Sequence, residues 1–133
     1  MICVPDTSVL VPALVDGGPA GEIARTELSL GDDFIAPALL DIEVTHVLRA
    51  RVHRGKLDAQ VARLALADLA MLPIRRLDSV PLLQRMWELR ENVTAYDAAY
   101  VALAEVFDAS VITADEALAK APGARCRFRL VRA

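Results

Sequence analysis

Residues 2–10 read ICVPDTSVL, a short apolar run that ends in a proline and an acidic residue before the apolar pattern resumes. A short apolar run bounded by a turn signal is typical of a buried strand. The pattern of residues 9–15, followed by the Gly- and Pro-containing residues 16–19, predicts a helix that ends there. Asp6 lies at the junction, so the segment predicts a strand, a polar turn and a helix, which together begin an α/β fold.

The same alternation continues along the chain and predicts a mostly parallel sheet with helices on both of its faces. In such sheets ligands bind beyond the carboxyl ends of the strands, where the strand order reverses. Asp58 and Thr94 are predicted N-caps of two of the helices. The remaining predicted strands cover residues 33–36, 74–77, 110–113 and 128–131, and the remaining predicted helices cover residues 20–30, 39–54, 59–72, 81–91, 95–107 and 116–120.

Length and composition limit the class of protein. A chain of 133 residues with a hydrophobic fraction of 55% fits one domain with a single core and excludes a disordered chain. No apolar run reaches the roughly 20 residues of a membrane span, and residues 1–6 lack a signal-peptide pattern, so we expect a cytoplasmic protein. The net charge of -3 argues against a protein that coats nucleic acid, although an enzyme that meets nucleic acid locally stays open.

Four carboxylates lie where folding alone would not place them. Asp6 and Asp115 each follow a predicted strand, Glu43 lies among apolar helix residues, and Asp97 begins a nearly all-apolar stretch. An acid on an apolar face costs free energy unless it is paired or binds a metal. Carboxylate oxygens are the ligands that Mg²⁺ and Mn²⁺ prefer. The four acids therefore suggest one divalent-cation site, whereas no His or Cys spacing suits zinc and His46 is predicted to be a surface residue.

Three of these acids also have a purely structural interpretation. Asp6 can cap the helix that follows it. Thr113 and Glu116 can form a capping box that spans Asp115. Asp97 can serve as a first-turn acid that complements a helix dipole.

Glu43 is harder to explain by structure alone. On the helical period it aligns with Leu40, Val47 and Ala50, so it should point inward or into a cleft. This stripe offers no partner for a buried acid, whereas the neighbouring Asp41 lies on a different face and should meet solvent. Acidic residues are rarely buried unpaired, which favours a functional role for Glu43.

Four segments resemble PIN-domain nucleases and, within that family, the VapC toxins of type II toxin–antitoxin pairs. The resemblance covers nearly the whole chain in order and spacing, and residues 94–105, TAYDAAYVALAE, are its most specific part. The other three segments are residues 4–10, VPDTSVL, residues 37–48, PALLDIEVTHVL, and residues 112–118, ITADEAL.

This resemblance implies a fold, an activity and a site. The fold would be a three-layer α/β/α sandwich with a small, mostly parallel sheet, formed by residues 1–133 as a single PIN-like domain. The activity would be endoribonuclease cleavage of RNA that depends on Mg²⁺ or Mn²⁺. Thr113 would hold a ligand or water, and the extra acids Asp41 and Glu116 lie beside matched positions. The resemblance assigns metal binding and catalysis to Asp6, Glu43, Asp97 and Asp115.

The family resemblance also implies partners, namely a VapB-like antitoxin and a second copy of the chain in a homodimer. The antitoxin would use the apolar faces of residues 9–15, 20–30, 39–54 and 58–72, and it would supply an arginine that pairs with the acids. For RNA, two basic clusters can bind phosphates without reading sequence, or can simply be solvated surface. They are Arg49, Arg51, Arg54 and Lys56, and the C-terminal Arg125, Arg127, Arg129 and Arg132.

Two other classes of function remain at this point. One is a phosphotransfer or phosphatase domain with an Asp after a strand of a doubly wound sheet. Ser8 replaces the second Asp that a haloacid-dehalogenase-like enzyme would need, and Asp78 follows the third predicted strand as a receiver-like phosphoacceptor would. The other is a catalytically silent PIN-like scaffold, which the four intact acids argue against.

Overall fold

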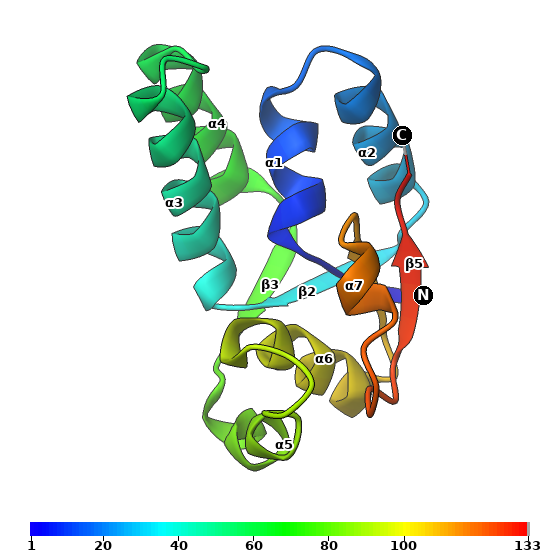
Figure 1. Cartoon of the computed structure of the whole chain (residues 1–133). Coiled ribbons are helices and arrows are strands. Elements are labelled where there is room, and N and C mark those ends of the chain that lie inside the picture. The colour runs from blue at the N-terminus through cyan, green and yellow to red at the C-terminus, as the bar shows by residue number, and fades with distance from the viewer. Residues whose placement is uncertain (133) are drawn as a thin grey trace.

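A five-stranded sheet, parallel throughout, runs through the centre of the molecule in the strand order β3-β2-β1-β4-β5 (Figure 1). The structure is a computed structural model and describes residues 1–132. The prediction of a mostly parallel sheet is therefore confirmed, and β1 is its central strand. The strands are β1 Ile2–Pro5, β2 Asp33–Pro37, β3 Ile74–Leu77, β4 Ser110–Thr113 and β5 Arg127–Leu130.

Helices cover both faces of this sheet, as alternating βα units require. Figure 1 shows α1 to α4 on one side of the sheet and α5 and α6 on the other, which confirms the three-layer α/β/α sandwich. The short α7 packs against β4 and β5. The helices are α1 Thr7–Val15, α2 Pro19–Ser29, α3 Leu39–His53, α4 Ala59–Met71, α5 Leu83–Glu88, α6 Ala95–Phe107 and α7 Glu116–Ala119, with a 3₁₀ turn at Val80–Leu82.

The helix α6 is the most deeply buried helix of the fold. Its residues 98–104 are all buried, and it contacts β1, β2 and β4. Four of these seven residues are alanines, whose small side chains let the helix lie close against the sheet. A helix that is apolar around its whole circumference must be buried. Thr94 caps its first turn as predicted, by accepting a hydrogen bond from the Asp97 backbone N–H at 3.2 Å, so the position of Asp97 is set by the core.

Two predicted features differ from the structure. The helix predicted for residues 81–91 is shorter, because residues 80–82 form a 3₁₀ turn and α5 ends at Glu88, after which the backbone N–H groups of Arg90 and Asn92 donate to carbonyls only three residues back. The capping box from Thr113 to Glu116 is also wrong. Asp115 is the N-cap of α7, with Oδ1 accepting hydrogen bonds from two backbone N–H groups at 3.0 and 3.2 Å. Thr113 ends β4 instead, and its hydroxyl accepts the Asp115 N–H.

None of the helices within residues 1–132 combines the length and the apolar character needed to cross a membrane.

Candidate active site

Two of the four predicted acids lie at the same edge of the sheet. Asp6 follows β1 and Asp115 follows β4, and these strands are neighbours, with Pro5 paired to Ile112. The Asp6 backbone N–H donates to the Ile112 carbonyl at 3.0 Å, which continues the pairing one residue beyond β1. From β1 the chain first builds the sheet towards β3, and it then returns to add β4 and β5 on the other side. The two acids therefore lie at the switch point of the strand order, where α/β sheets bind ligands.

Asp6 is the most buried of the acids, with 7% of its surface exposed. It is the N-cap of α1, because its Oδ1 accepts hydrogen bonds from both the backbone N–H and the hydroxyl of Ser8. Burial raises the pKa of this carboxyl to about 6, although the hydroxyls of Ser8 and Thr113 act in the opposite direction, and the negative charge of Asp97 raises it further. Burial thus disfavours the charged form of Asp6, as it does for many acids at functional sites.

Asp97 lies in the first turn of α6 and is half-buried. Burial raises the pKa of this carboxyl, and the negative charges of Asp115 and Glu43 raise it further, while the Thr94 hydroxyl offsets part of the effect. Asp97 therefore lies close enough to each of these acids to feel its charge. Glu43 of α3 and Asp115 of the β4–α7 turn thus both act on Asp97 of α6.

Glu43 points from α3 towards α6. Its Oε1 accepts a hydrogen bond from the Tyr100 hydroxyl at 2.6 Å and one from the Thr7 hydroxyl at 3.4 Å. Tyr100 is 1% exposed, and burial together with the neighbouring Glu43 raises the pKa of its phenol above the usual range, so it stays protonated and donates. Glu43 therefore faces inward as predicted, although it is half-buried and not fully buried.

Sequence reasoning missed Tyr100 as the partner of Glu43. The stripe of α3 offers no partner, and the hydroxyl comes instead from a helix 57 residues further along the chain. A signal was present, because Tyr100 is three residues after Asp97 and therefore on the same face of its helix. A buried tyrosine also normally needs a partner for its hydroxyl.

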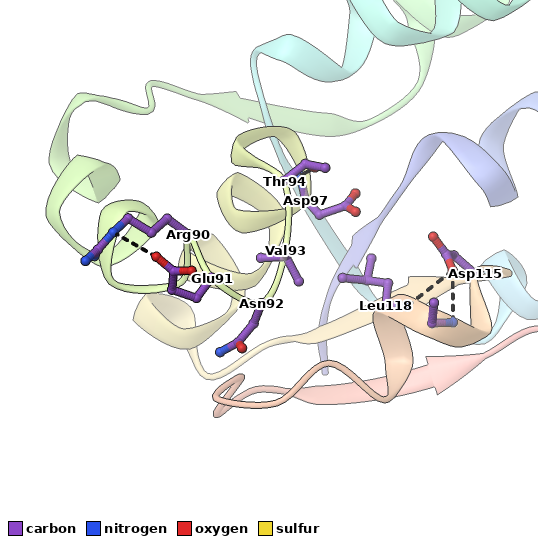
Figure 2. A pocket seen from close by; sticks show the side chains of 9 residues that line it. Arg90, Glu91, Asn92, Val93, Thr94, Asp97, Asp115 and Leu118 are labelled. Carbon is purple, nitrogen blue, oxygen red and sulfur yellow. Dashed lines mark hydrogen bonds and ion pairs between the residues drawn. The ribbon is translucent and has the colours of Figure 1, made fainter.

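Asp97 and Asp115 line one pocket of about 480 Å³, together with residues 90–94, Ala117 and Leu118. Figure 2 shows the Asp97 and Asp115 carboxylates pointing into the space between them. Arg90 lies at the other end, within 3.6 Å of Glu91 and stacked at 4.5 Å over the Trp87 ring. Arg90 is a basic residue that sequence reasoning overlooked at the site.

The acidic cluster carries no basic partner within residues 1–132, since no ion pair joins any of the four acids to Lys, Arg or His. An accumulation of negative, oxygen-only donors fits a hard divalent cation. In the same part of the chain, however, no three Asp, Glu, His or Cys side chains are arranged ready to hold a metal ion. Asp6 and Asp115 each direct one oxygen to a helix N-terminus, and Glu43 directs one to Tyr100. The donor chemistry therefore fits a metal, and side-chain rotation would be needed for joint ligation.

The two further acids Asp41 and Glu116, which neighbour Glu43 and Asp115 in the sequence, each form an ion pair outside the acidic cluster. Asp41 pairs with Arg76 at 3.0 Å, and Glu116 pairs with Lys120 at 2.8 Å. Each therefore has its own basic partner, which distinguishes them from Glu43 and its companions.

The first basic cluster of the prediction, residues 49–56, lies at the far end of α3 and just beyond it. Arg54 is eleven residues beyond Glu43, which places it roughly 16 Å further along the helix axis. Arg51 forms an ion pair with Asp16 at 2.9 Å. Arg54 therefore lies away from Glu43, and Arg51 is already engaged in an ion pair.

The C-terminal arginines are largely engaged within the fold. Arg127 pairs with Asp108 at 3.2 Å, and Arg129 pairs with Glu27 at 3.0 Å. Within the described chain these pairs assign both arginines a structural role, which agrees with the alternative of ordinary surface and packing contacts.

The strand order bears on the receiver-like alternative. Asp78 follows β3, which is the edge strand and is separated from β1 by β2. Receiver folds place the third strand beside the first. Asp78 therefore lies away from Asp6, and its Oδ1 accepts the Val80 backbone N–H at 3.2 Å. The structure argues against a receiver-like phosphoacceptor at this position.

Fold and site together define a class, the three-layer α/β/α domain with an acidic cluster at its switch point. Comparisons with known proteins identify the family. The model of the PIN domain matches residues 3–124. Ribonuclease VapC1 of Mycobacterium tuberculosis is 42% identical over 133 residues, covering 98% of each chain, and VapC ribonuclease Mb0985 of Mycobacterium bovis is 36% identical over 128 residues, covering 96% of this chain and 97% of that one. The chain belongs to the PIN-domain family and, within it, to the VapC ribonucleases.

Solved structures show the same fold at low sequence identity. Mycobacterium tuberculosis VapC20, described as a sarcin-ricin loop cleaving toxin, has a TM-score of 0.71 and 16% identity, covering 90% of this chain and 93% of that one. VapBC2 from Rickettsia felis, bound to a DNA fragment from their promoter, has a TM-score of 0.72 and 14% identity, covering 99% of this chain and 100% of that one.

Replacing Tyr100 with Phe tests the support of Glu43. The change keeps the buried ring and removes only the 2.6 Å hydrogen bond to Glu43. We expect kcat for RNA cleavage to fall about 10- to 100-fold, the range for losing a residue that orients a metal ligand. The free energy of unfolding should change by only about 1 kcal/mol. Steady-state kinetics and urea denaturation measure the two effects, and a kcat equal to that of the unmodified protein would contradict this role.

Proposed function

We propose that this protein is a divalent-metal-dependent endoribonuclease that acts as the toxin of a toxin–antitoxin pair. The observation that supports the proposal is that Asp6 and Asp115 follow the two neighbouring strands at the switch point. Asp97 feels the charges of Asp115 and Glu43, and none of the four acids has a basic partner within residues 1–132. The names of the relatives, all VapC ribonucleases, support the same activity.

Asp6 and Asp97 are the proposed principal ligands of Mg²⁺ or Mn²⁺, and Glu43 and Asp115 complete the cluster or orient the attacking water. The chemistry that a bound ion supplies is a more acidic water and neutralisation of the charge that builds on the phosphate. No residue of the described chain replaces that function, because the cluster contains no cation of its own.

The surrounding residues prepare the acids for this role. Ser8 holds Asp6 against the N-terminus of α1, and Tyr100 holds Glu43. Burial of Asp6 limits the competition of water for its carboxylate and makes each electrostatic interaction stronger than it would be at the surface. Arg90 lines the same pocket as Asp97 and Asp115 and would bind a phosphate of the substrate by exchanging its exposed contact with Glu91.

Cleavage assays with defined metals test the proposed activity. Purified protein is incubated with a mixed RNA pool in Mg²⁺, Mn²⁺, Ca²⁺ or EDTA, and cleaved ends are mapped. We expect internal cleavage in Mg²⁺ or Mn²⁺ and none in EDTA. The absence of cleavage under every metal condition would overturn the enzymatic proposal. That result would instead favour a silent scaffold, which the lack of a ready metal geometry within residues 1–132 keeps as the second candidate.

An apolar pocket between α1, α2 and α4 is the proposed seat of a VapB-like antitoxin. The pocket has a volume of about 470 Å³, and its lining includes Leu14 of α1, Leu28 of α2 and Met71 of α4. Met71 is 84% exposed, an unusual state for a large apolar side chain unless a partner covers it. The pocket lies on three of the four helices predicted from sequence, and α3 does not contribute to it.

Co-expression tests the partner. Expression of the chain alone should arrest growth, and expression with its neighbouring open reading frame should relieve the arrest. Growth arrest that the neighbour does not relieve would count against a toxin–antitoxin pair.

The remaining parts of the proposal concern organisation. Residues 1–133 would form a single PIN-like domain, of which residue 133 lies outside the described residues. The protein would form homodimers, and it would act in the cytoplasm, where its RNA substrate is.

A further inference from the structure

A further pocket lies beside the acidic cluster and shares Thr7 and Glu43 with it, while its other lining residues have no role in the site described so far. It has a volume of about 530 Å³, within the range of roughly 300–1,000 Å³ found for small-molecule sites. Two of its apolar side chains are open to solvent, with Tyr96 64% exposed and Ile42 73% exposed. The pocket is lined by Thr7, Ile42, Glu43, His46, Val47 and Tyr96.

This pocket adjoins the acids through two direct links. Glu43 lines the pocket and also raises the pKa of Asp97, so it belongs to both places. Tyr96 immediately precedes Asp97 in the first turn of α6, yet Tyr96 lines this pocket and Asp97 lines the other one. The first turn of α6 therefore separates two pockets that share the acidic cluster between them. A group that occupies the pocket lined by Tyr96 would lie against Glu43 of the acidic cluster.

The lining selects the chemistry of the occupant. It contains no Lys or Arg and does contain the acid Glu43, so a phosphate would be repelled. An exposed aromatic ring, two aliphatic side chains and one imidazole suit a flat group with apolar faces and a polar edge. Within RNA the group of that description is the base, which proteins recognise by stacking on aromatic side chains once it is unpaired. The basic Arg90, in contrast, lines the pocket on the other side of α6.

We propose that the pocket lined by Tyr96 binds the unpaired base of a nucleotide next to the scissile phosphate, stacked on Tyr96 with its polar edge towards His46. The inference rests on the proposed ribonuclease activity and deepens it. A base can enter this pocket only where it is unpaired, in a loop, in a single strand or turned out of a helix. The backbone would pass over the acids, with the next phosphates towards Arg90.

Substitutions at Tyr96 test the stacking. Tyr96→Ala should raise KM for a single-stranded oligoribonucleotide about tenfold or more, because stacking of one base on an aromatic residue has an effect of that size. Its kcat should change much less, since the acids stay in place. Tyr96→Phe keeps the ring and should match the unmodified protein. Val106→Ala, an equally exposed residue (67%) at the other end of α6, is the matched control and should change neither constant.

Changes in the substrate test the same contact from the other side. An oligonucleotide that lacks one base beside the cleaved bond should be cut poorly by the unmodified protein. Removing that base should have little further effect on cleavage by Tyr96→Ala, because the missing base and the missing ring remove the same stacking interaction. A perfect RNA duplex of the same sequence should resist cleavage. Equal KM values for Tyr96→Ala and the unmodified protein, or equal cleavage of duplex and single strand, would overturn the inference while leaving the ribonuclease proposal intact.

Two further measurements separate the remaining outcomes. Fluorescence anisotropy of the labelled oligonucleotide in Ca²⁺ reports binding even if no cleavage occurs. Weaker binding by Tyr96→Ala in an inactive protein would support the base pocket and reject the nuclease, and no binding by the unmodified protein would reject both. Sedimentation velocity reports the oligomeric state. A dimer that becomes a monomer in Tyr96→Ala would assign the pocket to a second copy of the chain and overturn the inference.

Discussion

RNA cleavage by Asp97→Asn is expected to fall at least 100-fold below that of the unmodified protein, with the fold retained. Asp97 is the acid on which the charges of Asp115 and Glu43 converge, so it occupies the centre of the proposed cation site. An amide of the same shape removes the charge and one strong metal ligand. Losing a residue that only orients a ligand already costs about 10- to 100-fold, and losing the ligand itself should cost more.

The Asp97→Asn substitution should not disturb helix α6, which carries residue 97. The N-cap of α6 uses the Thr94 hydroxyl and the backbone N–H of residue 97, and both remain in the variant. Single-turnover cleavage in Mn²⁺ and circular dichroism measure activity and fold. Glu116→Gln is a matched control, because Glu116 is an exposed acid with its own partner, Lys120. Cleavage by Asp97→Asn within a few-fold of the control would remove Asp97 from the metal site.

The metal-free protein should become more stable at pH 7 when Asp6 is replaced with Asn. Burial raises the pKa of the Asp6 carboxyl from 3.8 to about 6, so the folded state binds a proton more tightly than the unfolded state does. Ionisation of this group at neutral pH therefore costs folding free energy, by about 3 kcal/mol at most. The amide has no charge to bury, and its oxygen can still accept the hydrogen bonds from Ser8.

The sign of this effect sets its pH dependence. The buried Asp6 carboxyl stabilises the folded state while it is protonated. This stabilisation is fully present below its unfolded-state pKa of 3.8 and is lost as the pH rises through its folded-state pKa of about 6. The stability advantage of Asp6→Asn should therefore be largest at pH 7 and should shrink as the pH falls towards 5. Urea denaturation in EDTA at several pH values measures it. A variant that is less stable than the unmodified protein at pH 7 would contradict the buried charge.

Added divalent cation should offset most of the stability advantage of Asp6→Asn. A ligand that binds only the folded state stabilises it by about 2.7 kcal/mol at 100 times its Kd. The unmodified protein should gain this stabilisation in Mg²⁺ or Mn²⁺, and Asp6→Asn should gain little. Asp6 would therefore destabilise the metal-free protein and contribute stability only through the bound metal, as expected for a residue kept for function and not for stability.

Much of the fold was accessible from the sequence, because the patterns that define strands and helices are local. The strand at residues 74–77 and the N-caps Asp58 and Thr94 are as predicted. The helix predicted for residues 81–91 was overestimated at both ends, since the same apolar pattern also fits the 3₁₀ turn at Val80–Leu82 and the turns after Glu88.

What the sequence by itself determined is which acids follow strands or lie on apolar faces, since both properties depend on neighbours within a few residues. Only the tertiary structure decided what surrounds them. Glu43 accepts a hydrogen bond from Tyr100, 57 residues away in sequence, and remains among the four acids. Asp41 instead pairs with Arg76, 35 residues away, and lies outside that cluster. Strand order, which places Asp6 beside Asp115, and the two pockets on either side of α6 are also products of long-range packing. Such contacts form only when distant segments fold together, and no local pattern encodes them.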